Sequence, residues 1–429
     1  MIRWTLVWLA AAVATGANAQ TAATDARPQT LAPGAKAEPS PAPPRRASKE
    51  PPQKLLLTVS LFGGGADEVN TSDALRNGMH ADADAMLTYE RRVGRAVIAA
   101  NGRSVIREDA RATPTPMGQQ GNLDFSFVTR RQQFHASQGI GYSPYFEFGG
   151  LQQRDATPLG QAAASHGDFA TGDLSSITST TAVGWSRTIS QRFTFSAAYD
   201  LRRSVFGRSA LNMKSQSAGA RLTQRLTRYV SLRTGYTYRD SDATFVQPGR
   251  PRVHDLDVGL DYARPVSLSR RTTLQFASGS ALTPYTGGLA FNFTGNATLT
   301  RQIGRTWQAR VGATRDVQLL EGFADPVLAN AVTASVTGAV RRRVTFSSSL
   351  AVSRGSVGIV TVGNEYTNWT GGAGLSFALG RRVALETQFF VAGYQFDGNF
   401  AVAPGLTSRR QQRQGMRIGL TWRAPLLGH

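Results

Sequence analysis

The sequence predicts an all-β protein: a closed, antiparallel transmembrane β-barrel of about 18 strands, with 16 as the alternative count. Three features favour this fold. Apolar and polar residues alternate along segments of more than ten residues, these segments recur from residue 54 onward, and an export signal precedes them. A period of two describes a strand with one apolar and one polar face. Such segments reach the length of about nine to eleven residues that a tilted strand needs to cross a bilayer.

The stretch from Gly287 to Leu319 contains the repeating unit in its clearest form. Its first arm carries apolar side chains at every second position apart from Gly295, namely Leu289, Phe291, Phe293, Ala297 and Leu299. After a short turn at 302–304, the second arm alternates in the same way from Trp307 to Ala313. The unit is therefore a β-hairpin with one apolar face.

The same pattern places every strand in order. Strands are expected near 54–63, 79–90, 95–107, 122–129, 132–146, 174–188, 191–204, 214–226, 229–241, 252–264, 271–282, 287–300, 305–318, 328–340, 343–354, 364–379, 383–396 and 411–424. Short turns fall near 92, 130, 190, 227, 268, 303, 342 and 381, and longer connections include 63–79, 107–122, 147–174 and 397–410. This arrangement is typical of outer-membrane barrels and puts both barrel termini on the short-turn side, the periplasm.

A soluble β-sandwich would also produce alternation, because it buries one face of each sheet against another sheet. The barrel is favoured because the polar face continues along whole strands and the hairpin repeats eight or nine times without a domain break. An open sheet of this size would leave two unpaired edges in lipid, so the sheet is expected to close.

Two segments precede the barrel. Residues 1–19 are typical of a secretory signal peptide, with Arg3, an apolar core and an Ala17-Asn18-Ala19 cleavage site. Residues 20–53 are rich in Ala and Pro and predict a disordered periplasmic linker, either a peptidoglycan tether or an inert spacer. The barrel is expected over 54–429. The chain has no cysteine, so disulfides and a lipoprotein anchor are excluded.

The side-chain alternation assigns one set of residues to the lipid face. Expected outward residues are Leu57, Val59, Leu61, Phe193, Phe195, Tyr199, Val230, Leu232, Tyr236, Tyr238, Leu256, Val258, Leu260, Tyr262, Val344, Phe346, Leu350, Val352, Ile418, Leu420 and Trp422. Tyr and Trp fall mostly near strand ends, which is typical of aromatic girdles, although core packing in a soluble sheet is the alternative.

The formal net charge of +20 is carried almost wholly by arginine. Such a charge can indicate nucleic-acid binding. Here eighteen arginines lie at or beside the short turns, among them Arg91, Arg130, Arg187, Arg301 and Arg381. The charge therefore predicts a periplasmic rim that meets lipid phosphates, and no nucleic-acid partner is expected.

The opposite faces of three consecutive strands place charged residues in the lumen. This lumen charge ladder consists of Arg221, Arg225, Arg233, Arg239, Asp255, Asp257 and Asp261. Opposite charges on neighbouring strands can pair. The ladder is either a salt-bridged filler that stiffens the wall or a transverse field that orients polar solutes. Further lumen charges are expected at Asp82, Asp84, Arg310, Arg413 and Arg417. Much of the remaining wall is Ser, Thr, Asn, Gln and Gly, which suits polar solutes.

The sequence offers no catalytic constellation. His254 and Asp255 are adjacent in a strand and should point to opposite faces, so they cannot act as one acid/base pair. His166 lies near Ser165 and Asp168 in a long connection, without a positioned partner. Gly63-Gly64-Gly65 lacks the Lys-Ser/Thr sequel of a phosphate loop. No enzyme activity, cofactor or metal is expected.

Hairpins such as RYVSLRTGYTYRD (228–240) and RTWQARVGATRD (305–316) resemble those of porin-like bacterial outer-membrane β-barrel proteins, including poorly characterised barrels associated with exopolysaccharide systems. Family members usually close on a strand ending in a terminal aromatic residue that the barrel assembly machinery reads. Here Trp422 lies within the last strand and the sequence ends at His429. The resemblance thus implies that machinery as a partner, with an internal or atypical insertion signal.

These observations predict a channel in the cell outer membrane for passive diffusion or export of polar solutes, including saccharides or exopolysaccharide. The alternative is a structural or accessory barrel with a plugged lumen that scaffolds an envelope complex. Expected partners are outer-membrane lipid, a polar small-molecule or saccharide solute, and the barrel assembly machinery. The oligomeric state is left open.

Overall fold

The computed structural model describes residues 53–69, 78–109, 117–144, 146–147, 170–172, 175–207, 212–243, 252–265, 271–285, 288–319, 326–358, 364–397 and 410–427. The signal peptide and linker predicted over 1–53 lie outside these residues except for Gln53. The same is true of His166 and its neighbours. No described helix is long and apolar enough to cross a bilayer.

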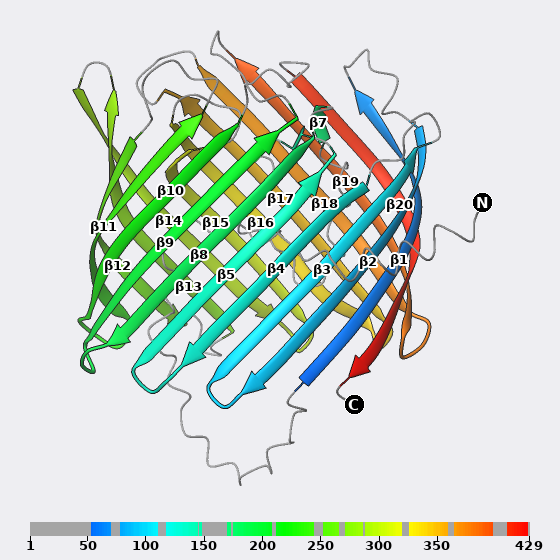
Figure 1. Cartoon of the computed structure of the whole chain (residues 1–429), viewed down its shortest axis with the longest axis horizontal. Coiled ribbons are helices and arrows are strands. Elements are labelled where there is room, and N and C mark those ends of the chain that lie inside the picture. The colour runs from blue at the N-terminus through cyan, green and yellow to red at the C-terminus, as the bar shows by residue number, and fades with distance from the viewer. Residues whose placement is uncertain are drawn as a thin grey trace.

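The described residues form one closed antiparallel sheet of 18 strands, which confirms the predicted fold and strand count (Figure 1). The strands of this sheet are β1 (Gln53–Val69), β2 (Gly78–Val93), β3 (Ala96–Asp109), β4 (Met117–Val128), β5 (Gln132–Ser143), β8 (Ser176–Thr188), β9 (Phe193–Phe206), β10 (Met213–Arg225), β11 (Val230–Ala243), β12 (Arg252–Pro265), β13 (Thr272–Tyr285), β14 (Gly288–Ile303), β15 (Trp307–Gln318), β16 (Val327–Arg341), β17 (Val344–Val357), β18 (Glu365–Ala378), β19 (Val383–Asp397) and β20 (Arg410–Leu427).

Closure occurs between the first and last strands. β1 pairs with β2 on one side and with β20 on the other, so each strand of the sheet has two neighbours. In Figure 1 the blue β1 and the red β20 lie side by side. Both barrel termini lie at the short-turn end, because Gln53 is opposite Arg91 and Leu427 is opposite Leu55. With strands about 4.8 Å apart and tilted by about 40°, eighteen of them enclose a cylinder about 35 Å across its backbone.

Several strands are longer than predicted at the end of the barrel that carries the long connections. β1 continues to Val69 and β3 to Asp109, so the connections expected at 63–79 and 107–122 shrink to 70–77 and 110–116. Two residues separate β13 from β14 at this end, where a longer connection was expected. A small second sheet pairs β6 (Phe146–Glu147) with β7 (Ala170–Gly172). It begins one residue before the predicted connection 147–174 and ends within it.

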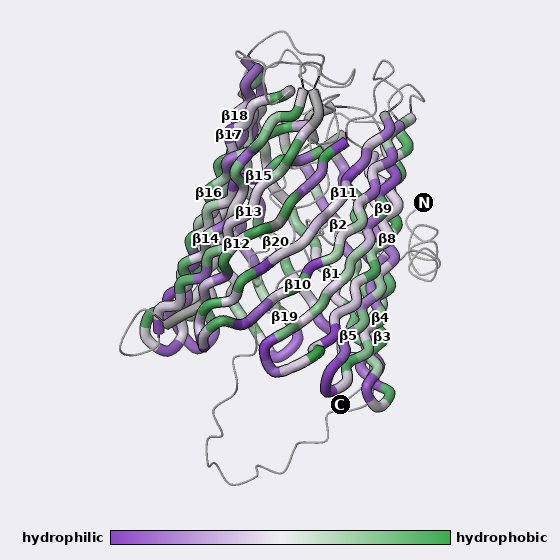
Figure 2. The backbone as a smooth tube through the Cα atoms, turned by 90° about the vertical axis from the view of Figure 1, so that its left-hand side faces the viewer, coloured by the Kyte–Doolittle hydropathy of each residue, from purple (hydrophilic) through white to green (hydrophobic). Residues whose placement is uncertain are grey.

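Hydropathy alternates along the strands (Figure 2). On β16 the outward residues from Val332 to Val340 are apolar, and both ends of this run are more than half exposed at 53% and 54%. Nine residues rising about 3.3 Å each at a tilt of about 40° span about 23 Å. Outward polar residues follow at the long-connection end, where Arg315 Nη1 donates to Asn330 Oδ1 at 3.1 Å. The apolar band therefore matches the roughly 25 Å band of outer-membrane barrels.

Candidate functional site

The polar side chains lie on the concave wall of the barrel, and the large apolar ones lie on its outer surface. On β12 Leu256, Val258 and Leu260 are 41%, 61% and 43% exposed, whereas Asp255 is 7% exposed. On β20 Ile418 and Leu420 are 51% and 49% exposed, whereas Arg417 is 3% exposed. A soluble protein would show the reverse, because water favours charged groups and excludes apolar ones. The distribution indicates that lipid surrounds the barrel and that its interior is polar.

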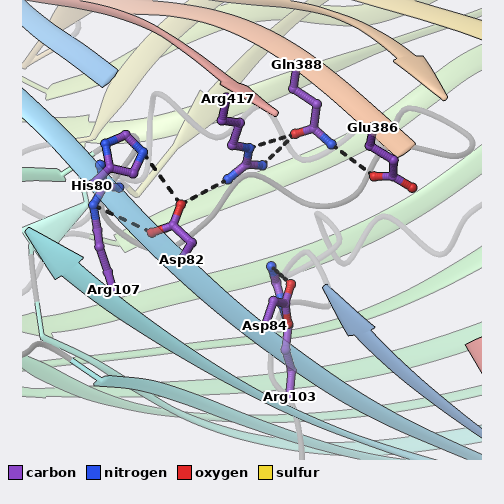
Figure 3. Close-up of polar contacts among 8 residues, drawn as sticks. All are labelled: His80, Asp82, Asp84, Arg103, Arg107, Glu386, Gln388 and Arg417. Atoms are coloured by element: carbon purple, nitrogen blue, oxygen red, sulfur yellow. Dashed lines mark hydrogen bonds and ion pairs between the residues drawn. The ribbon is translucent and has the colours of Figure 1, made fainter. Parts of the chain in front are cut away.

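The most buried charged cluster on the lumen wall lies at the closing seam, around Asp82 of β2 (Figure 3). The Asp82 carboxylate lies 3.7 Å from Arg417 Nη1, 3.8 Å from Arg107 Nε and 3.6 Å from His80 Nε2. All four side chains are nearly enclosed, with 1–3% of each exposed. One carboxylate is thus shared by two guanidinium groups that come from β3 and β20.

Arg417 reaches Asp82 across β1 because β1 carries a glycine at the crossing point. Gly64 lies directly opposite Arg417 on one side and His80 on the other. A Cβ at Gly64 would lie 2.7 Å from Arg417 Cβ and 2.5 Å from the Met416 carbonyl oxygen. The Arg417 guanidinium also lies over the Phe62 ring, 4.8 Å from its centroid. The absence of a side chain at Gly64 therefore lets Arg417 of β20 reach across β1 to Asp82 of β2.

The cluster continues in both directions along the wall. Arg417 donates to Gln388 Oε1 from Nε at 2.9 Å and from Nη2 at 2.6 Å, and Gln388 Nε2 donates to Glu386 at 3.4 Å. On the other side Arg103 Nη2 donates to Asp84 Oδ2 at 2.6 Å. Sequence reasoning predicted Asp82, Asp84 and Arg417 on the lumen wall. It missed His80, Arg103, Arg107 and Glu386, although the same alternation places them there.

The predicted lumen charge ladder is partly assembled. Arg233 Nη1 contacts Asp261 Oδ1 at 2.5 Å, and Arg239 Nη2 contacts Asp255 Oδ2 at 2.5 Å. Both pairs join β11 to β12 diagonally, as expected for neighbouring strands. Arg239 also lies 3.7 Å from Asp316 of β15, a partner that the sequence did not suggest because β15 is four strands away from β11.

The remaining predicted lumen residues are placed individually. Arg221 is 5% exposed and lies opposite Gly235, and Arg413 is 6% exposed and lies opposite Ala392. Arg225 belongs to the short-turn end, where its Nε donates to the Thr227 carbonyl at 3.3 Å. Arg310 is exposed on the wall of β15. The backbone of Asp257 lies opposite Gly235, and its side chain is outside the described part of the chain.

Arg233 also compensates for a break in the barrel wall. The β12–β13 register shifts by two residues between Leu256 and Asp261. In this bulge Arg233 Nη2 donates to the Ser278 carbonyl oxygen at 2.7 Å. On the lipid side, the Leu260 N–H donates to Ser278 Oγ at 3.3 Å, and Ser280 Oγ donates to the Leu256 carbonyl at 2.7 Å. Backbone groups in lipid must be satisfied internally, and here side chains replace the missing ladder bonds.

Small polar residues and glycines make up much of the wall between the two charged regions, as expected. Asn292, Thr294, Ser353 and Asn368 are each less than 10% exposed.

The wall also carries aromatic residues that the sequence interpretation did not include, namely Phe390, Tyr394 and Phe396 of β19 and Tyr366 of β18. The Tyr394 and Phe396 ring centroids are 4.9 Å apart, and the Tyr366 hydroxyl lies 3.1 Å from Ser353 Oγ. These rings are 1–6% exposed, so they pack within the wall.

The geometry at His254 separates it from its neighbour Asp255, as predicted. His254 lies outward, and its Nδ1 is 2.7 Å from the Tyr236 hydroxyl, whereas Asp255 pairs with Arg239 on the wall. Among the described residues, no group of three His, Asp or Glu side chains could hold a metal ion.

Comparisons with known proteins give a structural likeness only. No family model matches the sequence, and no curated protein does. Similar solved structures include Pseudomonas aeruginosa OpdL and OpdQ, each 12% identical with a TM-score of 0.45, covering 87% of this chain and 99% of theirs. The structure of P. aeruginosa OccK2 (OpdF) in complex with glucuronate is 12% identical with a TM-score of 0.45, covering 87% of this chain and 98% of that one. The described chain is a closed 18-stranded antiparallel β-barrel with a lipid-facing exterior and a polar wall within.

Proposed function

We propose that this protein is an outer-membrane channel through which polar solutes diffuse passively. The observation that carries the proposal is the inverted distribution of side chains, with apolar residues exposed outside and charged residues enclosed on the inner wall along the full height of the barrel. A closed wall about 35 Å across its backbone is wide enough to leave an aqueous path, as in barrels of 16 to 18 strands.

We further propose that uncharged polar solutes, saccharides included, pass more readily than ions. The charged groups of the wall are largely engaged with each other, as in the Asp82–Arg417, Asp84–Arg103 and Asp261–Arg233 pairs. Paired charges leave little net field along the path, whereas hydroxyl and amide groups can exchange hydrogen bonds with a passing sugar. A polar wall is unsuited to a fatty-acid path.

Conductance of the purified protein in planar bilayers tests the channel. Stable open-channel steps at ±100 mV support it. The absence of steps, for protein shown to be folded by gel mobility, would instead favour the accessory barrel with a plugged lumen.

Liposome swelling tests the solute class. Proteoliposomes in isosmotic solutions of a neutral disaccharide and of a monovalent organic anion of similar size should swell faster in the disaccharide. Equal or reversed rates would contradict the assignment to uncharged solutes while leaving the channel itself intact.

A further inference from the structure

The two ends of the barrel differ in charge. Segments 91–98, 126–134, 186–195, 223–232, 301–309, 339–346 and 376–385, which contain seven short turns, carry 16 arginines and no Asp or Glu. At the opposite end basic residues face acidic ones, as in Arg354 with Glu365 at 2.5 Å and Arg252 with Asp240 at 4.0 Å. In Figure 2 the turns at the lower end are coloured mainly hydrophilic. The short-turn end is therefore a basic rim, and the other end has mixed charge.

Strand register determines which rim arginines face away from the lumen. Arg91 lies directly opposite Ile98, and Arg187 lies directly opposite Phe195, two residues of the outer face. Arg301 follows Leu299, which is 40% exposed on that face, by two positions of β14. All three arginines are exposed. These arginines therefore lie on the outer surface just beyond the apolar band, on its short-turn side.

Aromatic residues indicate the depth of two of these arginines, Arg187 and Arg91, in the bilayer. Trp185 precedes Arg187 by two positions on the outer face and packs edge-on against Phe195, with ring centroids 5.8 Å apart. Tyr89 holds the same position before Arg91. Tyr and Trp prefer the headgroup level of a bilayer, so a guanidinium one step beyond them lies at the depth of the lipid phosphates. Arginine binds phosphate oxygens through two parallel N–H donors.

We propose that the outward arginines Arg91, Arg187 and Arg301 bind the phosphate groups of anionic glycerophospholipids in the leaflet at the short-turn end. The site is a lateral surface shared by neighbouring lipids, continuous with the apolar band that holds their acyl chains. This continuity distinguishes lipid from a free anion, because an anion in solution would have no reason to prefer arginines beside the apolar band over those at the turn tips.

Tryptophan quenching by brominated lipids tests the proposal on the full-length protein in vesicles. Trp185, Trp307 and Trp422 lie near this end and report on adjacent lipids. At low salt, brominated phosphatidylglycerol should associate about fivefold more strongly than brominated phosphatidylcholine, since a basic residue near a charged leaflet contributes about 1 kcal/mol to binding of an anionic lipid. The preference should fall toward unity in 0.5 M salt.

The matched variants remove equal charge from the same end. R91Q/R187Q/R301Q should lose the preference, whereas R92Q/R192Q/R305Q, with one lumen-side and two turn arginines changed, should keep it. A wild-type ratio near unity would overturn the proposal, as would an equal loss in both variants. Stronger displacement of brominated phosphatidylglycerol by lipid A than by the unbrominated lipid would also overturn it. Gel mobility verifies folding, and if the outward triple variant fails to fold, Arg187→Gln beside Trp185 carries the test.

Discussion

Arg233 reaches across β12 and donates a hydrogen bond from Nη2 to the main-chain carbonyl oxygen of Ser278 on β13, at 2.7 Å. The same guanidinium contacts Asp261 at 2.5 Å. It bridges the two-residue register shift where the β12–β13 ladder is interrupted. Gly259 makes this possible, because a Cβ at its position would overlap the Ser278 carbonyl. A residue predicted only as a lumen charge therefore also holds the wall together.

Arg233→Gln should destabilise the barrel by about 3 kcal/mol or more, because it removes the guanidinium that contacts the Asp261 carboxylate and donates to the Ser278 carbonyl in an enclosed site. Denaturant-induced unfolding in lipid vesicles, followed by tryptophan fluorescence, measures the change. Arg310→Gln is the control: this arginine is exposed on the same wall, and its loss should change stability by less than about 0.5 kcal/mol. Equal effects in the two variants would contradict the bridging role.

Gly64→Ala should impair closure of the barrel, because the new methyl group would collide with Arg417 and the Met416 carbonyl of β20. Heat-modifiable mobility on a gel reports the fraction of folded barrel after refolding, and this fraction should fall. Gly63→Ala provides a close control, since a Cβ there meets nothing within 4 Å. Normal refolding of Gly64→Ala would show that Arg417 can move aside at no cost.

Asp82→Asn should lower the free energy of unfolding by about 3 kcal/mol or more, because the Arg107 and Arg417 guanidinium groups would lose their shared negative charge. Adding Arg417→Gln to this variant should recover part of the loss, since it removes one of the two positive charges that face residue 82. Strict additivity of the two single changes would argue against coupling across β1.

Ser278→Ala and Ser280→Ala should each cost about 1–3 kcal/mol, because each removes the partner of a backbone group on the lipid face. Ser348→Ala is the control, because Ser348 occupies an outward position in an unbroken stretch of the β17–β18 ladder. Unfolding in vesicles would distinguish them. A loss as large for Ser348→Ala would rule out the ladder repair as the cause.

Asp257→Asn should shift the reversal potential toward greater anion selectivity if the β11–β12 charges orient ions in the lumen, because it removes one negative charge of the predicted ladder. A planar bilayer with a salt gradient measures this shift. An unchanged reversal potential in both Asp257→Asn and Arg233→Gln would leave the ladder with only its structural role.

The sequence alone determined the architecture. Alternation along more than ten residues identified all eighteen strands, because in a membrane barrel lipid and the polar interior impose opposite requirements on successive side chains. Seven of the eight predicted short turns lie within the described residues, and the wall positions of Asp82, Asp255 and Arg417 agree with the same period. His254 and Asp255 were separated correctly on this basis alone.

Which charged side chains contact each other depends on the tertiary structure. Asp82 contacts Arg417 over the gap at Gly64, and Arg239 contacts Asp316 from a strand distant along the wall. Alternation says which face a side chain occupies, but contact depends on strand register, on bulges and on where a glycine leaves room for a long side chain to cross. Those depend on how strands far apart in the chain are aligned, which a period of two does not encode.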